Sequence, residues 1–219
     1  MVGVHRGRID LEELMRGPWT DVGLMHRAFA EVDVRFDGTP LPRLIGFAGD
    51  EPLAMVTLRP FDPGEALGPM IEALAFLLPF GANRISAGFP GRGWSLDDPI
   101  PPVTDEVDLR QRIVVEMRVV QDATVSSCLH PFAINDGAIV WEEPLDLGPP
   151  EGHLAHALAV TMAGRHTVRV GPGDILEQLA RMGVRGHELA VAPQGAVWLE
   201  RLALDADSGG RAWEIHQAD

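Results

Sequence analysis

An alternating stretch in the middle of the chain constrains the fold most. Apolar residues occupy every second position of the segment 112–121: Ile113, Val115, Met117 and Val119. The charged residues Glu116 and Arg118 lie between them. Because successive side chains of a strand point to opposite faces, this pattern predicts a strand with one face in the core.

Two further apolar segments follow this strand, at 125–134 and 138–143. The residues between them, Asn135-Asp136-Gly137, tolerate positive φ and are typical of a tight hairpin. The three segments therefore predict an antiparallel meander. A second hairpin is predicted earlier, where "LIGF" (44–47) and "LAMVTL" (53–58) flank "AGDEP".

Helical patterns lie before and after the hairpin predicted at 44–58. A short helix is predicted from Asp10, and a longer one over 20–34, where apolar residues recur three or four positions apart. A third helix is predicted from Asp62 as N-cap, with Pro63 at its first position and Pro79 as its stop. Its broad apolar face predicts a buried, central position.

The fold class that follows is α+β, with a mostly antiparallel sheet, a buried central helix and a C-terminal helical and hairpin extension. The segment "DLGPPEG" (146–152) interrupts all periodicity and is the best domain boundary. It divides the chain into a core domain, 1–147, and an extension, 148–219, unless the whole chain forms one domain. The extension is predicted to contain helices at 150–163 and 172–182 and strands at 196–205 and 211–216.

Composition excludes several classes of protein. The net charge is −14, and the chain contains neither lysine nor tyrosine. P-loop enzymes, protein kinases, pyridoxal enzymes and Ser-Lys hydrolases all require a lysine. The acidic surplus disfavours nucleic acid and anionic membranes as partners. The use of arginine alone indicates a bacterial genome rich in G and C.

The single cysteine, Cys128, excludes an internal disulfide and every site built from several thiolates. The N-terminus has no apolar signal region, and no window approaches the length of a membrane span. We therefore expect a cytoplasmic protein.

The glycine-rich stretch "SAGFPGRGW" (86–94) raises the question of phosphate binding. A phosphate-binding glycine loop opens a helix, whereas prolines and aspartates follow here. We expect an irregular loop from Phe89 to Asp108. Such a long loop is either mobile or a lid over a small-molecule ligand, with Arg92 and Trp94 as the residues that contact it.

Cys128 and His130 lie two apart on a predicted strand and so share a face. A thiolate nucleophile needs a base within hydrogen-bond reach, which makes this pair the candidate catalytic residues of a thiol enzyme. The alternative is a half-buried cysteine beside a histidine that is bonded to the backbone.

His153 and His156 lie three apart near the start of a predicted helix and share a face, so they are the candidate metal ligands. Zinc or another divalent metal is the cofactor that such a site would hold. No glutamate occupies the position that helical zinc motifs use. The alternative is an amphipathic helix with histidines at its polar border, and no other cofactor is predicted.

Two classes of function remain. The first is a non-catalytic protein that forms homo-oligomers or binds a small molecule, because five tryptophans and eight methionines suit an interaction surface. The second is an enzyme, either a metal-assisted hydrolase that uses His153 and His156 or a thiol enzyme that uses Cys128 and His130. The sequence leaves open whether the protein is an enzyme.

Overall fold

The computed structural model describes residues 13–62, 64–78, 81–95, 97–104, 108–165, 177 and 180–197. Within them, eight strands form one antiparallel sheet in the order β6-β5-β4-β3-β1-β2-β8, and β7 pairs with β5. The strands are β1 (Arg43–Ala48), β2 (Glu51–Thr57), β3 (Arg84–Gly93), β4 (Gln111–Val120), β5 (Val125–Asn135), β6 (Ala138–Trp141), β7 (Leu145–Gly148) and β8 (Glu188–Val191). This sheet with its helices confirms the predicted α+β class.

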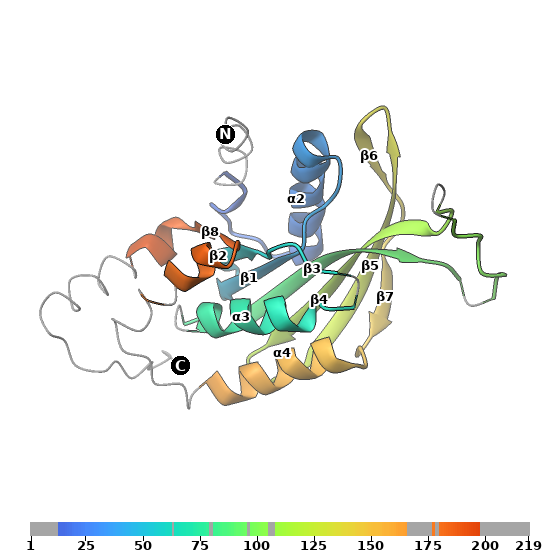
Figure 1. The fold of residues 1–219 in the computed structure, drawn as a ribbon. Coiled ribbons are helices and arrows are strands. Elements are labelled where there is room, and N and C mark those ends of the chain that lie inside the picture. The colour runs from blue at the N-terminus through green and yellow to red at the C-terminus, as the bar shows by residue number, and fades with distance from the viewer. Residues whose placement is uncertain are drawn as a thin grey trace, which may run out of the picture.

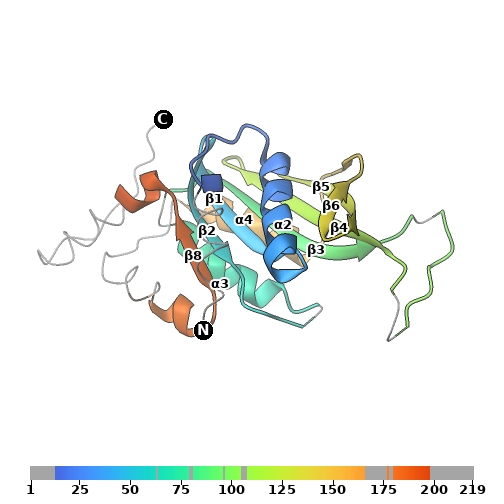
Figure 2. The ribbon, with the colours of Figure 1, turned by 90° about the horizontal axis from the view of Figure 1, so that it is seen from above.

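Helices cover both faces of the sheet (Figure 1). Helix α2 (Val22–Asp37) lies across one face, and helices α3 (Leu67–Leu77) and α4 (His153–Gly164) lie side by side on the other (Figures 1 and 2). The largest apolar cluster lies between the sheet and α3 and α4. A smaller one lies beneath α2.

The predicted hairpins are confirmed. Asp136 and Gly137 join β5 to β6 with φ of 50° and 78°, so both residues of the turn adopt the left-handed conformation. Such a turn matches the twist of antiparallel strands, which is why an aspartate-glycine pair occurs there. The segments 43–48 and 51–57 pair as β1 and β2.

The prediction of an irregular loop from Phe89 to Asp108 was wrong for its first residues. Strand β3 continues to Gly93 and pairs with β4 along its whole length, from Arg84 opposite Val120 to Gly93 opposite Gln111. Its glycine-rich end has little strand propensity of its own. The neighbouring strand β4, with its strong alternation, supplies the pairing partner, because strand formation depends on cross-strand context more than on intrinsic preference.

A capping side chain begins helix α2, and a glycine ends it. The side chain of its N-cap, Asp21, accepts a hydrogen bond from the Leu24 N–H at 3.3 Å. Gly38 ends the helix with φ of 77°, and its N–H donates to the Val34 carbonyl. Both are standard terminations, and the helix predicted over 20–34 is confirmed.

Helix α3 begins later than predicted. It starts at Leu67 rather than Pro63, and its N-cap is Ala66 rather than Asp62. Gly64 has φ of 91°, which no right-handed helix accommodates. The chain makes a turn first, with the Glu65 N–H bonded to the Asp62 carbonyl at 3.0 Å.

The C-terminal part contributes to the same sheet. The edge strand β8, which the sequence reading missed, pairs antiparallel with β2. The helix predicted at 150–163 is present as α4, residues 180–182 are helical as predicted for 172–182, and the helix continues through residues 183 and 184. Residues 193–197 form a helical turn, so the strand predicted from Ala196 does not start there. The rest of that strand and the strand predicted at 211–216 lie outside the described residues, as does Asp10.

Among the described residues, the helices are all too short or too polar to cross a membrane.

A buried ion pair joins α2 to β1. Asp33 and Arg43 are each 3% exposed, and two guanidinium nitrogens of Arg43 donate to the two carboxylate oxygens of Asp33. The Asp33 carboxylate also accepts from the Leu41 N–H at 2.8 Å, and the guanidinium lies over the Phe29 ring. The pair thus sets the position of α2 on the sheet.

Replacing one partner of this pair should destabilise the fold strongly. Arg43→Met leaves the Asp33 carboxylate buried without its counter-charge, and we expect a loss of about 3–5 kcal/mol in the free energy of unfolding. Urea denaturation measures it. The control is Arg181→Met, which removes an ion pair to Glu177 whose side chains are 67% and 60% exposed and should cost about 0.5 kcal/mol or less. Equal losses in the two variants would contradict the assigned role.

Candidate functional site

A row of polar residues crosses the sheet beneath α2. Alternation places Glu116 and Arg118 of β4 on the same face as Cys128 and His130 of β5. Ser86 of β3 lies on this face too, and α2 contributes His26, which contacts it. Four of these residues are at most 4% exposed: His26, Ser86, Glu116 and His130. We call these four the polar cluster.

Two glycines let α2 approach the polar cluster closely. A Cβ atom at Gly23 of α2 would lie 2.8 Å from Cε1 of His130, and one at Gly88 of β3 would lie 2.4 Å from Nδ1 of His26. Real Cβ atoms do not approach that near, so only glycine fits at either position. This close packing excludes solvent from the cluster.

Glu116 and His130 form a buried hydrogen-bonded pair. Nε2 of His130 donates to Oε2 of Glu116 at 2.8 Å, and Arg118 makes an ion pair with the other carboxylate oxygen. Burial disfavours the ionised carboxylate, but the bond from His130 and the charge of Arg118 outweigh it, so the pKa of Glu116 lies below its usual value. Nδ1 of His130 is buried without a hydrogen-bond partner.

His26 and Ser86 form the second pair, with 2.7 Å between Nε2 and Oγ. Burial lowers the pKa of His26 from 6.5 to about 4, and the nearby negative charge of Glu116 offsets this only in part. His26 is therefore neutral at pH 7. Because Ser86 is 0% exposed, its hydroxyl does not face solvent and is available only to His26.

Cys128 lies at the border of the polar cluster. It is directly opposite Glu116 in the strand register and is partly exposed, and its Sγ lies 3.7 Å from the Leu129 carbonyl oxygen. Burial, followed by the charge of Glu116, raises the pKa of this thiol. The two predicted catalytic residues thus share a face as expected, and the structure adds Glu116 as the carboxylate that orients His130. Their catalytic role stays a prediction.

Arg92 and Trp94, the predicted ligand-binding residues, lie where β3 leaves the sheet. Nη1 of Arg92 donates to the Arg110 carbonyl at 3.1 Å, and its Nε lies 3.7 Å from Oδ2 of Asp108. Trp94 follows β3 directly and is 39% exposed. The segment between β3 and β4, described at 94–95, 97–104 and 108–110, projects from the body, and we call it the arm (Figures 1 and 2).

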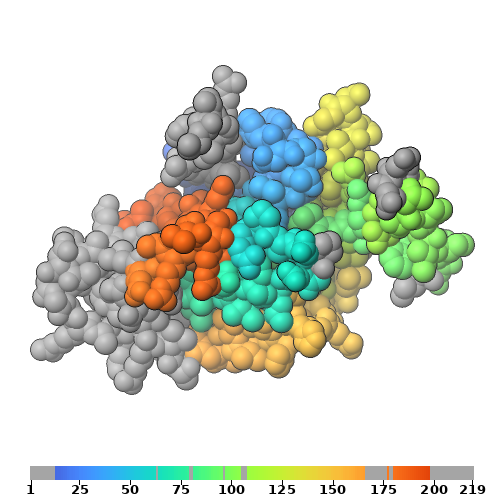
Figure 3. All heavy atoms as spheres, in the orientation of Figure 1, coloured from blue at the N-terminus to red at the C-terminus, as the bar shows by residue number. Residues whose placement is uncertain are grey.

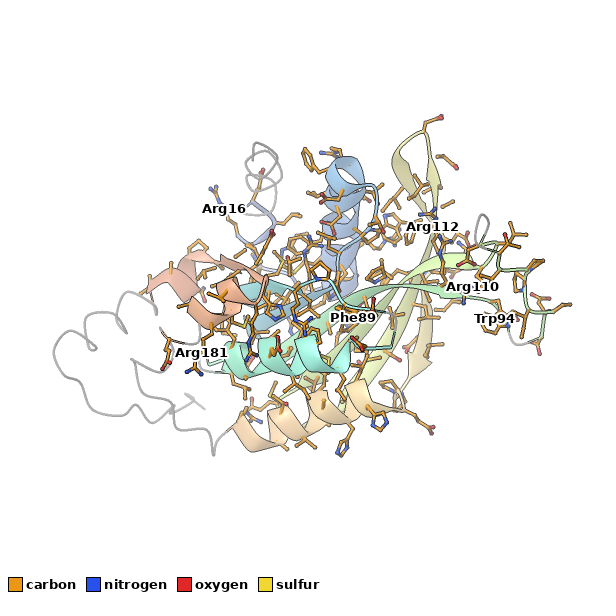
Figure 4. All side chains as sticks on the ribbon, viewed as in Figure 1. Arg16, Phe89, Trp94, Arg110, Arg112 and Arg181 are labelled. Atoms are coloured by element: carbon orange, nitrogen blue, oxygen red, sulfur yellow. The ribbon has the colours of Figure 1, made fainter. Side chains whose placement is uncertain are left out.

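Three arginines lie at the base of the arm, and the sequence analysis identified only Arg92 among them. Arg92 and Arg112 face each other directly across β3 and β4, on the face that α2 covers. Arg110 makes two bonds of 2.9 Å to the carboxylate of Asp108. The hydrogen bond from Arg110 lowers the pKa of Asp108 to about 2, so the carboxylate stays ionised. Figure 4 shows Arg110 and Arg112 at the base and Trp94 farther out.

The arm exposes large apolar side chains, although contacts join its described parts. The bridge between Val103 and Asp108 and the bond from the Leu109 N–H to the Pro102 carbonyl hold its two sides together. Four apolar residues of the arm are exposed: Trp94 (39%), Ile100 (69%), Val103 (53%) and Leu109 (63%). The space-filling view shows the arm projecting beyond the sheet on the side away from β8 (Figure 3).

His153 and His156, the predicted metal ligands, lie in the first turn of α4 and are both exposed. Within the described residues, histidine, cysteine and carboxylate side chains do not gather in groups of three that could hold a metal. His166, which follows α4, lies outside those residues. The metal hypothesis stays a prediction.

A cluster that the sequence reading missed joins α3 to the segment before β8. Nε2 of the buried His187 donates to Glu72 at 2.7 Å, and its Nδ1 accepts from the Arg59 N–H at 3.1 Å. Arg185 adds an ion pair to Glu72 at 3.0 Å. Both ring nitrogens of His187 are occupied, so its role is structural. No local motif indicates this cluster, because its two halves, Arg59 with Glu72 and Arg185 with His187, lie more than a hundred residues apart.

No protein-family model, curated protein or solved structure matches the chain significantly.

The polar cluster makes stability depend on pH. Unfolded His26 binds a proton near pH 6.5, whereas folded His26 binds one only near pH 4, so stability is full above 6.5 and falls as the pH drops towards 4. The shift corresponds to a loss of about 3 kcal/mol over that window. We expect urea unfolding of His26→Gln to show a shallower pH dependence. The exposed-histidine variant His153→Gln should keep the wild-type slope, and identical slopes in all three proteins would exclude His26 as the cause.

The thiol of Cys128 should react slowly. Because its pKa is raised above the ordinary value of 9.0, alkylation by iodoacetamide should reach half its maximal rate only above that pH. The same chain unfolded in urea provides the reference rate. If the folded protein instead reaches half-maximal alkylation below about pH 8.5, the thiol is activated and the thiol-enzyme hypothesis gains support.

Proposed function

We propose that the protein is a non-catalytic interaction protein that associates with itself through the arm. The observation that carries this proposal is the exposure of Ile100, Val103 and Leu109 on a projecting segment. Large apolar side chains that are exposed to solvent are unfavourable, and burying them against a protein surface recovers about 25 cal/mol for each Å² removed from water.

The construction of the arm supports an interaction role. A long connection between strands in a compact domain is commonly functional. This one is anchored by hydrogen bonds and ion pairs of Arg92, Asp108 and Arg110 at its base. A segment that is anchored at its base loses less conformational entropy on binding than a disordered one.

The properties of the polar cluster support the interpretation that the cluster is not catalytic. Its acid–base groups bond to one another, Ser86 is wholly buried, and the thiol at its border has a raised pKa. A catalytic nucleophile needs access to substrate and an activated state. The cluster instead positions α2 on the sheet.

Mutation of the arm should abolish self-association. We expect wild-type protein to sediment as a dimer or larger oligomer, and the double variant Ile100→Asp/Leu109→Asp to sediment as a monomer, because charges replace the apolar contact. The matched control is Val160→Asp/Val184→Asp, which adds the same charge at positions 55% and 89% exposed on other elements. It should associate like the wild type.

Sedimentation velocity over a range of protein concentrations makes this measurement, and circular dichroism verifies that each variant is folded. A wild-type protein that remains monomeric at every concentration excludes the proposal. So does an arm variant that associates as tightly as the wild type.

A further inference from the structure

The two ends of the arm carry opposite charges. Its base holds Arg92, Arg110 and Arg112, whereas the outer part carries Asp97 and Asp98, both exposed. The base lies at the sheet and the outer part projects away from it (Figure 4). The arm thus presents a basic and an acidic surface at separate places.

Among the described residues, the positive charge of the basic end exceeds the negative charge that contacts it. Arg92 and Arg110 share the carboxylate of Asp108. Arg92 and Arg112 are direct cross-strand neighbours, and like charges in that position destabilise a sheet. In the part of the chain that the structure describes, Arg112 has no carboxylate partner. An arginine cluster of this kind on a protein of net charge −14 is suited to an external carboxylate.

The acidic end is uncompensated too. Among the described residues, neither the Asp97 nor the Asp98 carboxylate forms an ion pair or hydrogen bond, and both side chains are exposed. The unpaired aspartates of the outer part are therefore suitable partners for the arginines of the base.

A two-fold axis brings unlike ends together. In a symmetric dimer, if residue i of one copy contacts residue j of its partner, then residue j of the first contacts residue i of the second. Two arms that run antiparallel beside each other therefore place the acidic end of each against the basic end of the other. The dimer therefore contains two identical contacts between an acidic end and a basic end.

We propose that the arms of two copies pair in this antiparallel manner, with Asp97 and Asp98 of one copy bound to Arg112 and its neighbouring arginines in the other. The proposal rests on self-association through the arm, and it identifies the partner as a second copy of this chain. The exposed side chains of Ile100, Val103 and Leu109 belong to the same arm and become the apolar part of the contact. The charges set the direction and register of the pairing.

Charge reversal tests this arrangement. Arg112→Glu places like charges at both contacts of its homodimer, and Asp97→Arg/Asp98→Arg does the same in its own. At low salt each variant alone should dimerise at least about tenfold more weakly than the wild type. Mixed in equal amounts, the two should form heterodimers with nearly wild-type affinity, because one contact is then native and the other has its charges exchanged.

The specificity control is Arg16→Glu, a charge reversal at an exposed position on the N-terminal segment. Alone, it should dimerise like the wild type. In a mixture with Asp97→Arg/Asp98→Arg it offers one native contact, and it should not restore dimers further than that single contact does. Native mass spectrometry resolves homodimers from heterodimers by mass, and circular dichroism verifies folding.

The outcomes separate this inference from the proposed function. Restoration in the mixture of the two reversed variants supports antiparallel pairing. A wild-type dimer that Arg112→Glu leaves unchanged, or a mixture without heterodimers, overturns the pairing while self-association stands. A monomeric wild type overturns both. Inorganic phosphate that binds the wild type but not Arg112→Glu, with dimerisation unaffected, assigns the arginines to a small anion and likewise overturns the pairing.

Discussion

The pairing of β3 with β4 is the contact on which the rest of the structure depends. Its register runs without interruption from Arg84 opposite Val120 to Gly93 opposite Gln111. It places Ser86 and Glu116 beneath α2, and it places Arg92 opposite Arg112 at the base of the arm. A shift of one strand by one residue would turn its side chains in this set to the other face.

The two faces of the sheet are packed by different means. The face beneath α3 and α4 is apolar, whereas α2 covers apolar residues near its start and, beside them, buried pairs such as Asp33 with Arg43 and Glu116 with His130. Burying a polar group costs free energy unless it is paired. The close approach that Gly23 and Gly88 permit keeps the polar cluster dry, and most of its polar atoms are paired, Nδ1 of His130 being an exception.

Local patterns were enough for most elements but not for their ends or for the sites. The alternation in β4, the turn at Asp136-Gly137 and the periodicity of α2 each record a preference of a few neighbouring residues. The start of α3 depended on the backbone of Gly64, and the end of β3 depended on β4. Cys128 and His130 were correctly placed on one face, but Glu116, His26 and Ser86 come from other elements.

By itself, the sequence determined the α+β class, the hairpins, the positions of α2 and α4 and the exclusion of lysine-dependent chemistry, because each follows from composition or from short-range periodicity. Only the tertiary structure decided that Glu116 orients His130, that His187 bonds to Glu72, and that Arg92 faces Arg112. These contacts join residues distant in the chain. Their energies depend on burial and register, which exist only once the sheet has formed.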